Sequence, residues 1–352
     1  MRVFGLIADD LTGAGDASVQ FAARGWPTFL TLDGHYDATV PAHSVVAVTT
    51  DCRALGNEAA EQRTYEAVQR LMTAGTERIF LKIDSTMRGS VPGQIAGALR
   101  AWSARHPEAC AVVCPAYPHM GRTVESNRLL VHGQPVHETA IGRDPISPVR
   151  TSEMSSLLPS VASVVVPDAV SDDDLREIAS RIAAKGPAAI AVGSGGLAGA
   201  LAEVLSTRLD GGLPGQIPTF VNPRILLLVT SLNPVSHAQV ARLKREVPDV
   251  AVVLAPTERV PGAAIADELA EKFAQLVEQS RWDVLGLIGG DGARAALRRL
   301  GASGIRIVNA VIEGIPAGFI AGGSADGIAV FTKAGGFGAE DAMVRVVERI
   351  RA

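Results

Sequence analysis

The chain has 352 residues, of which 47% are hydrophobic and 20% are charged, and its formal net charge is −4. This length predicts two domains, and the composition is typical of a globular protein and excludes a disordered one. Aromatic residues make up 4% and no long basic run occurs, so neither a stacking platform nor a basic footprint for nucleic acid is expected. The expected partner is therefore a small molecule.

The cysteines and the first residues of the chain indicate in which cellular compartment the protein is expected. Cys52, Cys110 and Cys114 suit neither a disulfide framework nor a metal site, and for Cys110 and Cys114, on or beside one predicted strand, buried structural thiols are the simpler interpretation. The first residues run directly into an apolar strand without a charged leader and cleavage site, and no apolar run reaches the length of a membrane span. We therefore expect a cytoplasmic protein that binds no membrane.

An acidic turn follows the first predicted strand, the apolar run at residues 3–8. Asp9, Asp10 and Asp16 lie in this turn and at the start of the helix predicted after it. Like charges at short range repel, so three aspartates indicate a metal, a cationic partner or hydrogen bonds to substrate hydroxyls. A helix N-cap is the structural explanation, and it accounts for only one of them.

Three later strands of the first half also end in polar clusters, at residues 49–53, 82–88 and 119–123. Parallel strands end at one edge of a sheet, so these clusters are expected to line one cleft. For the second cluster alone, a surface loop in which Asp84 caps a helix and pairs with Arg88 fits equally well. Aspartates accept hydrogen bonds from hydroxyls and arginines hold carboxylates, so a small polyhydroxy acid fits the cleft.

Glycine turns characterise the second half. Residues 206–222 contain Gly and Pro without periodicity and predict a boundary between domains at 1–210 and 222–352. Glycine turns then follow two apolar strands, at residues 289–292 and 334–338, and Lys333 precedes the second. Their N–H groups suit a phosphate at a helix start, and the lysine suits a phosphate clamp, although each turn alone is weak evidence. A similar turn at residues 193–196 is explained nearly as well by close helix–strand packing.

These patterns predict an α/β protein of two domains, each a mainly parallel sheet flanked by helices, with the ligand cleft between them. The acid–arginine clusters occur in the first domain and the glycine turns mainly in the second. We therefore expect the first domain to bind an acid and the second a nucleotide.

At this point the chain resembles a known family, the four-carbon acid sugar kinases, once described as a domain of unknown function. The resemblance spans nearly the whole chain and is most specific in the first half. The motifs, in order, are IADDLTGAGD, TTDCR, LKIDSTMRGS, PAYPHMGRTV with GQPVHET, VGSGGLAGALA, IGGDGARA and TKAGGFG. Members of the family phosphorylate threonate, erythronate or 3-oxo-tetronate with ATP.

The resemblance implies a substrate-binding first domain, a nucleotide-binding second domain, and ATP and Mg²⁺ as cofactors; the metal ligands and the oligomeric state stay open, a homodimer being one option. Catalytic roles are expected for Asp9, Asp10, Asp84 and Arg88, with the catalytic base undecided among the aspartates. Substrate binding is expected for Asp51, Arg53, Lys82, Ser85 and Arg122. Nucleotide binding is expected for Ser231, Gly289, Gly290, Asp291, Gly292, Lys333, Gly335, Gly336 and Gly338.

The second domain departs from the family pattern where hydroxyl side chains are usual. Asn233 stands in place of a serine, Gly292 in place of a threonine and Ala334 in place of a serine, and this half is shorter than the family leads us to expect. These changes keep open a sugar-acid-binding or regulatory protein with impaired catalysis. Two further enzyme classes fit less well: a kinase of the NAD-kinase or lipid-kinase type would have Gly-Gly-Asp-Gly-Thr early in the nucleotide domain, and a dehydrogenase would have G-x-G-x-x-G after the first strand.

Overall fold

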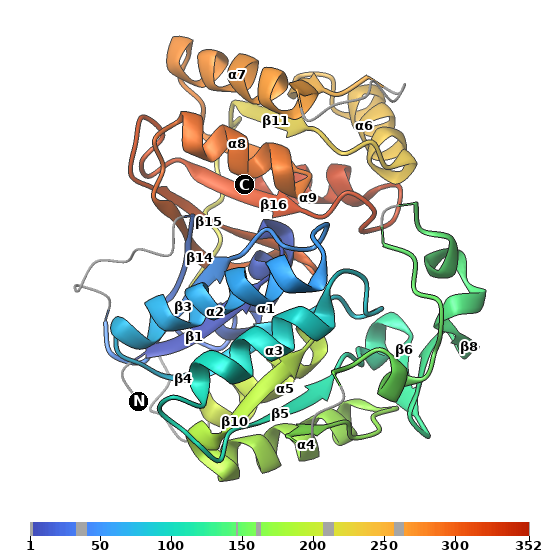
Figure 1. Cartoon of the computed structure of the whole chain (residues 1–352). Helices are drawn as coiled ribbons and strands as arrows, with labels where there is room; N and C mark the ends of the chain where they lie inside the picture. The colour runs from blue at the N-terminus through green and yellow to red at the C-terminus, as the bar shows by residue number, and fades with distance from the viewer. Residues whose placement is uncertain are drawn as a thin grey trace.

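The computed structural model describes residues 3–32, 41–145, 147–159, 163–206, 215–256 and 264–351. Within these ranges the chain forms two α/β halves, the first below and the second above in Figure 1. The predicted boundary at 206–222 includes residues 207–214, which lie outside the described ranges. The predicted α/β class is confirmed.

The first half is built on parallel strands in the order β9-β5-β10-β4-β1-β3-β2. These strands are β1 (Val3–Ala8), β2 (Thr28–Thr31), β3 (Ser44–Thr49), β4 (Thr76–Lys82), β5 (Cys110–Cys114), β9 (Val164–Val165) and β10 (Ala189–Gly193). Strands β1 and β3 are buried at every residue. Burial on both faces explains why their sequences are continuous apolar runs rather than alternating ones.

Helices cover both faces of this sheet. They are α1 (Leu11–Ala22), α2 (Asn57–Thr73), α3 (Val91–Trp102), α4 (Asp172–Lys185) and α5 (Gly195–Ser206). Helix α2 packs against α3, while α5 packs against both α1 and α4. Each of α1, α2, α3 and α5 follows a strand whose end faces the second half, so the starts of these helices lie at the same edge of the sheet.

The second half combines four parallel strands with an antiparallel hairpin. The parallel strands are β11 (Ile225–Val229), β12 (Ala251–Leu254), β13 (Val284–Ile288) and β16 (Ala329–Lys333), and the hairpin is β14 (Gly304–Ile312) with β15 (Ile315–Ala321). The helices are α6 (Pro234–Glu246), α7 (Ala264–Gln279), α8 (Gly290–Arg299) and α9 (Ala342–Ile350). Helix α7 packs against α8, and α6 against α9.

The two halves share one continuous sheet, a feature the sequence did not suggest. Strand β14 pairs antiparallel with β2, from Gly304 opposite Thr31 to Ile307 opposite Thr28, and this joins the strands into a single 13-stranded sheet. A side chain on Gly304 would meet the carbonyl of Leu30 at 2.1 Å, so only glycine permits this close approach. The pairing gives hydrogen-bond partners to backbone N–H and C=O groups of β2 and β14, which would lie at exposed edges if the halves formed two separate sheets.

A small antiparallel sheet lies beside the first half, at the right in Figure 1. It consists of β6 (Arg122–Glu125), β7 (Arg128–Val131) and β8 (Gln134–Pro135). Short 3-10 helices flank it or connect other elements: η1 (Pro118–Met120), η2 (Val136–Glu138), η3 (Ala140–Arg143), η4 (Met154–Ser156) and η5 (Gly186–Ala188). Residues next to η1 and η3 reach the space between the halves.

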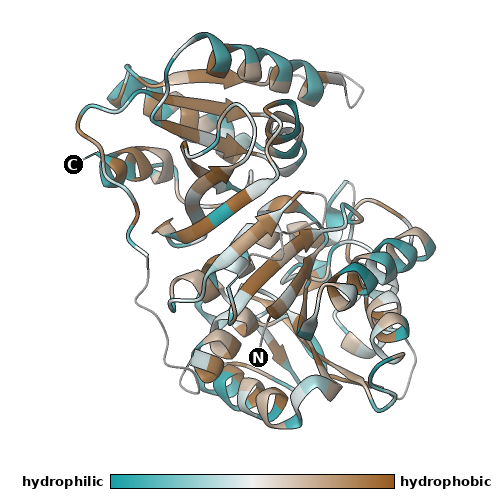
Figure 2. Cartoon of the chain, turned by 90° about the vertical axis from the view of Figure 1, so that its left-hand side faces the viewer, coloured by the Kyte–Doolittle hydropathy of each residue, from teal (hydrophilic) through white to brown (hydrophobic). Residues whose placement is uncertain are grey.

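Apolar residues concentrate in the strands, as the hydropathy colours of Figure 2 show, and most of them are buried. Cys52, Cys110 and Cys114 are buried and free, and for Cys110 and Cys114 this agrees with the expected structural thiols. In the described ranges, none of the helices combines the length and the apolar character needed to cross a membrane.

Candidate functional site

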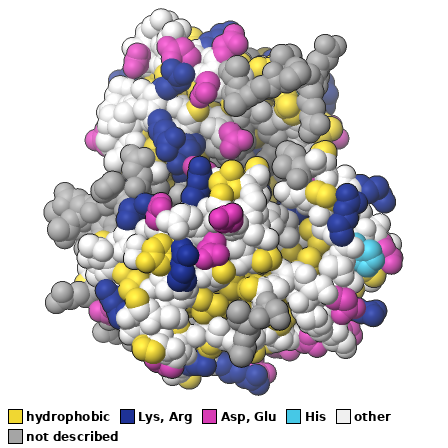
Figure 3. Space-filling model, in the orientation of Figure 1, with side chains coloured by type: hydrophobic (Ala, Val, Ile, Leu, Met, Phe, Trp, Pro, Cys, Tyr) yellow, Lys and Arg dark blue, Asp and Glu magenta, His cyan; other side chains and the backbone are white. Residues whose placement is uncertain are grey.

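Two neighbouring cavities lie between the halves, where Figure 3 shows basic and acidic side chains close together. The larger has about 400 Å³, and its walls include Asp16, Lys82, Ser85 and Arg122 from the first half and Asn233, Thr332 and Gly336 from the second. The smaller has about 280 Å³ and is lined by Asp9, Asp10, Asp51, Asp144, Gly290 and Asp291, among others. Arg53 and Arg88 line both. The predicted cleft between the halves is thus present.

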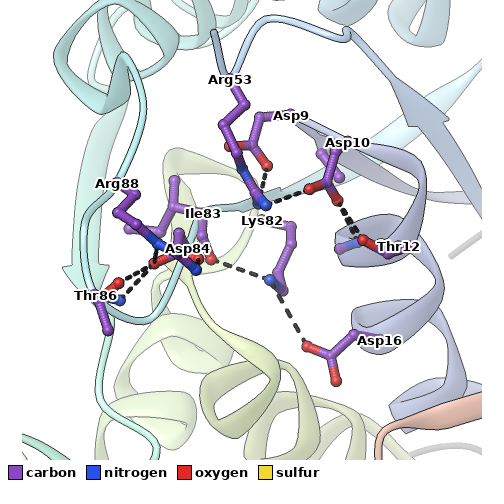
Figure 4. A network of polar contacts seen from close by, with 12 residues as sticks. Asp9, Asp10, Thr12, Asp16, Arg53, Lys82, Ile83, Asp84, Thr86 and Arg88 are labelled. Carbon is purple, nitrogen blue, oxygen red and sulfur yellow. Dashed lines mark hydrogen bonds and ion pairs between the residues drawn. The ribbon is translucent and has the colours of Figure 1, made fainter. Parts of the chain in front are cut away.

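Arg53 holds two aspartates at the end of β1 (Figure 4). Its Nε and Nη2 each donate to one carboxylate oxygen of Asp9 at 2.8 Å, and its Nη1 contacts Asp10. Burial raises the pKa of Asp9, which has no exposed surface, although Arg53 opposes that effect. Because Arg53 already binds two carboxylates, it is poorly placed to hold the carboxylate of a substrate as well.

Asp10 begins helix α1. Its side chain accepts hydrogen bonds from the N–H of Gly13 and from the hydroxyl of Thr12, at 2.5 and 3.1 Å. The N-cap interpretation of the acidic turn therefore holds for this aspartate, and Asp10 combines that function with its ion pair to Arg53.

Asp84 and Arg88 form an ion pair after β4, but the surface-loop interpretation is wrong in the rest: Asp84 is buried and does not cap a helix, because α3 begins after Ser90. Arg88 Nη2 lies 2.9 Å from Asp84 Oδ2, and the N–H of Thr86 donates to Asp84 Oδ1 at 2.9 Å. Burial opposes ionisation of Asp84, but Arg88 and Arg53 outweigh it and hold the pKa far below its ordinary value. Arg88 also contacts Asp144 at 3.3 Å, a residue that the sequence did not single out.

Lys82 and Asp16 form an ion pair in the wall of the larger cavity. Lys82 Nζ donates to the carbonyl of Ile83 at 3.1 Å and lies 3.7 Å from Asp16 Oδ2. Asp16 rests against Gly195, the first residue of α5, where an added methyl group would meet its carboxylate at 2.8 Å. Burial raises the pKa of Asp16, and Lys82 lowers it by less. Asp16 was noted in the acidic turn but was not among the predicted site residues.

Arg122 and Ser85 also line the larger cavity. One guanidinium nitrogen of Arg122 donates to the carbonyl of Met120, while the buried Nε has no partner in the described part of the chain. Burial lowers the pKa of Arg122. No carboxylate partner is found for Arg122 among the described residues, so its guanidinium is available to an anionic group in the cavity that it lines.

Asp51 is held by the opposite half. Its carboxylate lies 2.7 Å from Arg294 Nη1 on α8, and its backbone adopts a left-handed conformation with φ of 49°. Burial raises the pKa of Asp51, with Arg294 opposing. Asp51 lines the smaller cavity, but its ion pair connects the two halves.

Lys333 does not face either cavity, in contrast to the phosphate clamp predicted from its position. It is 1% exposed, and its ammonium donates to the carbonyls of Ala334, Gly335 and Phe337 at 2.8, 3.1 and 2.8 Å. Burial lowers its pKa to about 8. The physical reason is that β16 is buried at every residue, so a lysine at its end can satisfy its charge only within the adjoining loop.

The loop after Lys333 is held from α6 as well. Ser236 donates to the carbonyl of Gly335 at 2.6 Å, and Gln239 Nε2 donates to the carbonyls of Phe337, Gly338 and Ala339 at 3.0, 3.1 and 2.8 Å. Within the described ranges, no hydrogen bond is found from the N–H of Gly335 or Gly336. The loop thus turns carbonyls inward and leaves N–H groups available, and Gly336 lines the larger cavity.

The remaining predicted nucleotide-binding residues converge on the same region. Gly289, with φ of 104°, and Gly292 pack against Thr230, and Gly335 packs against Ser231, so added methyl groups would meet these side chains within 2.7 Å. Gly290 and Asp291 begin α8 and line the smaller cavity. The structure therefore brings together the turns after β11, β13 and β16. Gly338 lies further along, against Ala342.

Both halves match known protein families. Residues 4–163 match a sugar-binding N-terminal domain, and residues 251–343 match a nucleotide-binding C-terminal domain. The chain is 36% identical to a D-threonate kinase of Bordetella bronchiseptica, with 99% of this chain and 97% of that protein aligned. It is 27% identical to a D-erythronate kinase of Heliobacterium modesticaldum, with 97% and 96% aligned.

Two solved structures share the architecture. A domain of unknown function from Bordetella bronchiseptica, a domain-swapped dimer with bound citrate, is 35% identical over 99% of both chains, with a TM-score of 0.56. A putative tRNA synthase from Salmonella typhimurium is 19% identical over 100% of both chains, with a TM-score of 0.80, and shows likeness of fold only.

Proposed function

The chain belongs to the family of four-carbon acid sugar kinases, and from this premise we propose that it transfers the γ-phosphoryl group of ATP to a hydroxyl of a four-carbon sugar acid. Threonate, erythronate and 3-oxo-tetronate are the candidate acids. The observation that carries the proposal is the larger cavity, because its walls combine charged side chains of one half with the glycine loop of the other. Phosphoryl transfer depends mainly on such positioning and on charge stabilisation.

The sugar acid would bind in the larger cavity. Its carboxylate would accept hydrogen bonds from the guanidinium of Arg122, and Lys82 and Ser85 would complete the polar wall. Arg88 lines the same cavity with Asp84 already bound to it. We propose that Arg53, Asp9, Asp10 and Asp84 shape and neutralise the site rather than perform the chemistry, because their charges are paired with one another.

The phosphates would lie against the glycine turns of the second half. The free N–H groups of Gly335 and Gly336 and the start of α8 at Gly290 suit an anion. Among the described residues no cluster of three or more potential ligands forms a ready metal site. Mg²⁺ bound with phosphates needs only one or two carboxylates, and Asp291, exposed at the smaller cavity, fits that donor type. Bound there, Mg²⁺ would neutralise phosphate charge.

The proposal also includes the domain bounds. We propose that residues 1–210 form the sugar-acid domain and 222–352 the nucleotide domain. A cytoplasmic location and a homodimer remain predictions from the sequence. A regulatory protein with impaired catalysis is not favoured, because the relatives over the full length of the chain are named as kinases.

The proposal predicts turnover in a coupled assay for ADP release. Purified protein with Mg-ATP would be tested against threonate and erythronate in both stereochemistries and against 3-oxo-tetronate. Turnover on one acid is expected, and Arg122→Ala should raise the KM for that acid about ten- to hundredfold because a charged hydrogen bond is lost.

The matched control is Arg128→Ala on the same small sheet, whose side chain is 61% exposed and pairs with Glu153 at the surface. It should leave both kinetic constants unchanged. Absence of turnover on every acid, with thermal shifts that show acid binding but no ATP binding, would contradict the kinase proposal.

A further inference from the structure

We propose that Asp16 is the general base that takes the proton from the attacking hydroxyl of the sugar acid. This inference rests on the proposed function and adds a catalytic residue to it. The carboxylate lies on α1, six residues after the N-cap Asp10, and was not among the aspartates from which a base was expected. Two properties single it out: its place in the wall of the larger cavity and the small number of groups that it already contacts.

The other carboxylates near the site are engaged. Asp9 is fully buried with both oxygens on Arg53, and Asp10 caps α1 and contacts the same guanidinium. Both line the smaller cavity. Among the described residues, the carboxylates in the wall of the larger cavity are those of Asp84 and Asp16. Asp84 accepts from Thr86 and Arg88, and its pKa is far below the ordinary value, which makes it a weak base.

Asp16 has fewer competing partners. Within the described residues, one ion pair is found for Asp16, whose Oδ2 lies 3.7 Å from Lys82 Nζ. Its charged or titratable neighbours are Asp10 on its own helix, Lys82 and Asp84 from β4 and the loop after it, and Tyr117 from the loop after β5. Burial raises the pKa of Asp16 above its ordinary value of 3.8, with Lys82 opposing, and this brings it closer to that of an effective base.

Helix α1 lies against the nucleotide half at the residue before Asp16. A methyl group on the neighbouring Gly15 would meet Pro316 at 3.0 Å and the hydroxyl of Thr332 at 3.2 Å. Thr332 is 2% exposed, lines the larger cavity, and its hydroxyl has no hydrogen-bond partner in the described part of the chain. Asp16 and Thr332 line the same cavity from the two halves. Substrate would thus lie between Asp16 and the second half.

In the transfer step, the substrate O–H proton passes to the carboxylate of Asp16 as the substrate oxygen forms its bond to the γ-phosphorus of ATP. The bond from that phosphorus to the bridging oxygen breaks, and its electron pair remains on ADP. Lys82 stabilises the carboxylate before transfer, and the protonated Asp16 releases its proton to solvent after product leaves. A positioned base of this kind typically contributes about a hundredfold or more to the rate.

The test compares Asp16→Asn with wild type on the acid identified by the ADP assay. We expect kcat to fall at least about a hundredfold, while thermal shifts with the acid and with ATP stay close to wild type. The pH profile of kcat/KM should lose its acidic limb in the variant. Asp172→Asn, an exposed aspartate at the start of α4, is the matched control and should leave the rate and the profile unchanged.

Asp16→Glu keeps a carboxylate and should retain an acidic limb with reduced kcat; it also serves if Asp16→Asn fails to fold. The inference is overturned if Asp16→Asn keeps more than about a tenth of the wild-type kcat with an unchanged pH profile, or if the acidic limb of Asp16→Glu is absent. An inactive wild type would instead refute the proposed function, and the role of Asp16 with it, so the two failures are distinguishable.

Discussion

At the scale of single residues, the pairing of charges decides what each site residue is able to do. Asp9 is buried with both oxygens on Arg53, and two donors of one planar guanidinium compensate its charge. Removing one partner of a buried pair leaves the other charge uncompensated, which costs more than the pair itself contributes. Arg53 should therefore matter for folding as well as for the shape of the cavities.

We predict that Arg53→Met lowers the free energy of unfolding by about 3 kcal/mol, since breaking a buried ion pair typically costs that order of energy. Urea denaturation followed by circular dichroism measures the change. Arg128→Met, which removes a surface pair, is the control and should change little. The double variant Asp9→Asn with Arg53→Met should recover part of the loss. A single variant as stable as wild type would show that Asp9 is satisfied in another way.

The sequence predicted which residues gather here, but only part of how they pair. Strand ends that meet at one sheet edge explain why Asp9, Arg53, Lys82 and Arg88 came together. The partners depend on distances between loops, which no periodicity encodes. Asp16 was within reach of sequence reasoning: once Asp10 is the N-cap, residues 12, 13 and 16 share one helix face, and all three line the larger cavity.

At the scale of elements, the glycine loop after β16 depends on donors that lie outside it. Lys333 looked like a phosphate ligand because it adjoins glycines, yet β16 is buried along its length, and its lysine turns into the loop. Gln239 on α6 is buried and reaches three loop carbonyls. Nothing in the α6 sequence indicates this contact, because it joins residues about 100 positions apart.

We predict that Gln239→Leu raises the KM for ATP about tenfold and leaves the KM for the acid close to wild type. The carbonyls of Phe337, Gly338 and Ala339 would lose their donor, and an unsatisfied buried group costs about 1–3 kcal/mol. The loop would then no longer hold its N–H groups toward the phosphates. Steady-state kinetics with each substrate varied in turn measures the split.

The control is Gln275→Leu on α7, the same substitution at an exposed glutamine that contacts Glu271 on its own helix. It should leave both constants unchanged. Equal increases in the KM for ATP and for the acid in Gln239→Leu would contradict a loop-specific role and indicate a general loss of structure.

At the scale of the whole molecule, the two halves are joined more closely than the two separate sheets predicted from the sequence. Length and glycine content predicted the two halves, and the parallel strands were visible as apolar runs. The pairing of β14 with β2 was not predicted, because neither residues 28–31 nor residues 304–312 were identified as a strand from the sequence. Two further contacts, Arg294 with Asp51 at 2.7 Å and His119 with Glu313 at 3.0 Å, also cross between the halves.

We therefore predict that both halves unfold in one cooperative transition. The tryptophans allow a direct test, since Trp26 and Trp102 are buried in the first half and Trp282 lies in the second. Urea unfolding of Trp282→Phe by fluorescence reports the first half, and a variant that keeps only Trp282 reports the second. We expect the two midpoints to coincide with each other and with the midpoint measured by far-ultraviolet circular dichroism. If one half unfolded alone, the β14–β2 hydrogen bonds would break and backbone N–H and C=O groups of the other half would lose their partners. Midpoints that separate would mean that the β14–β2 pairing holds the halves in place without coupling their stability, and the cavities would then lie between two independently folding units.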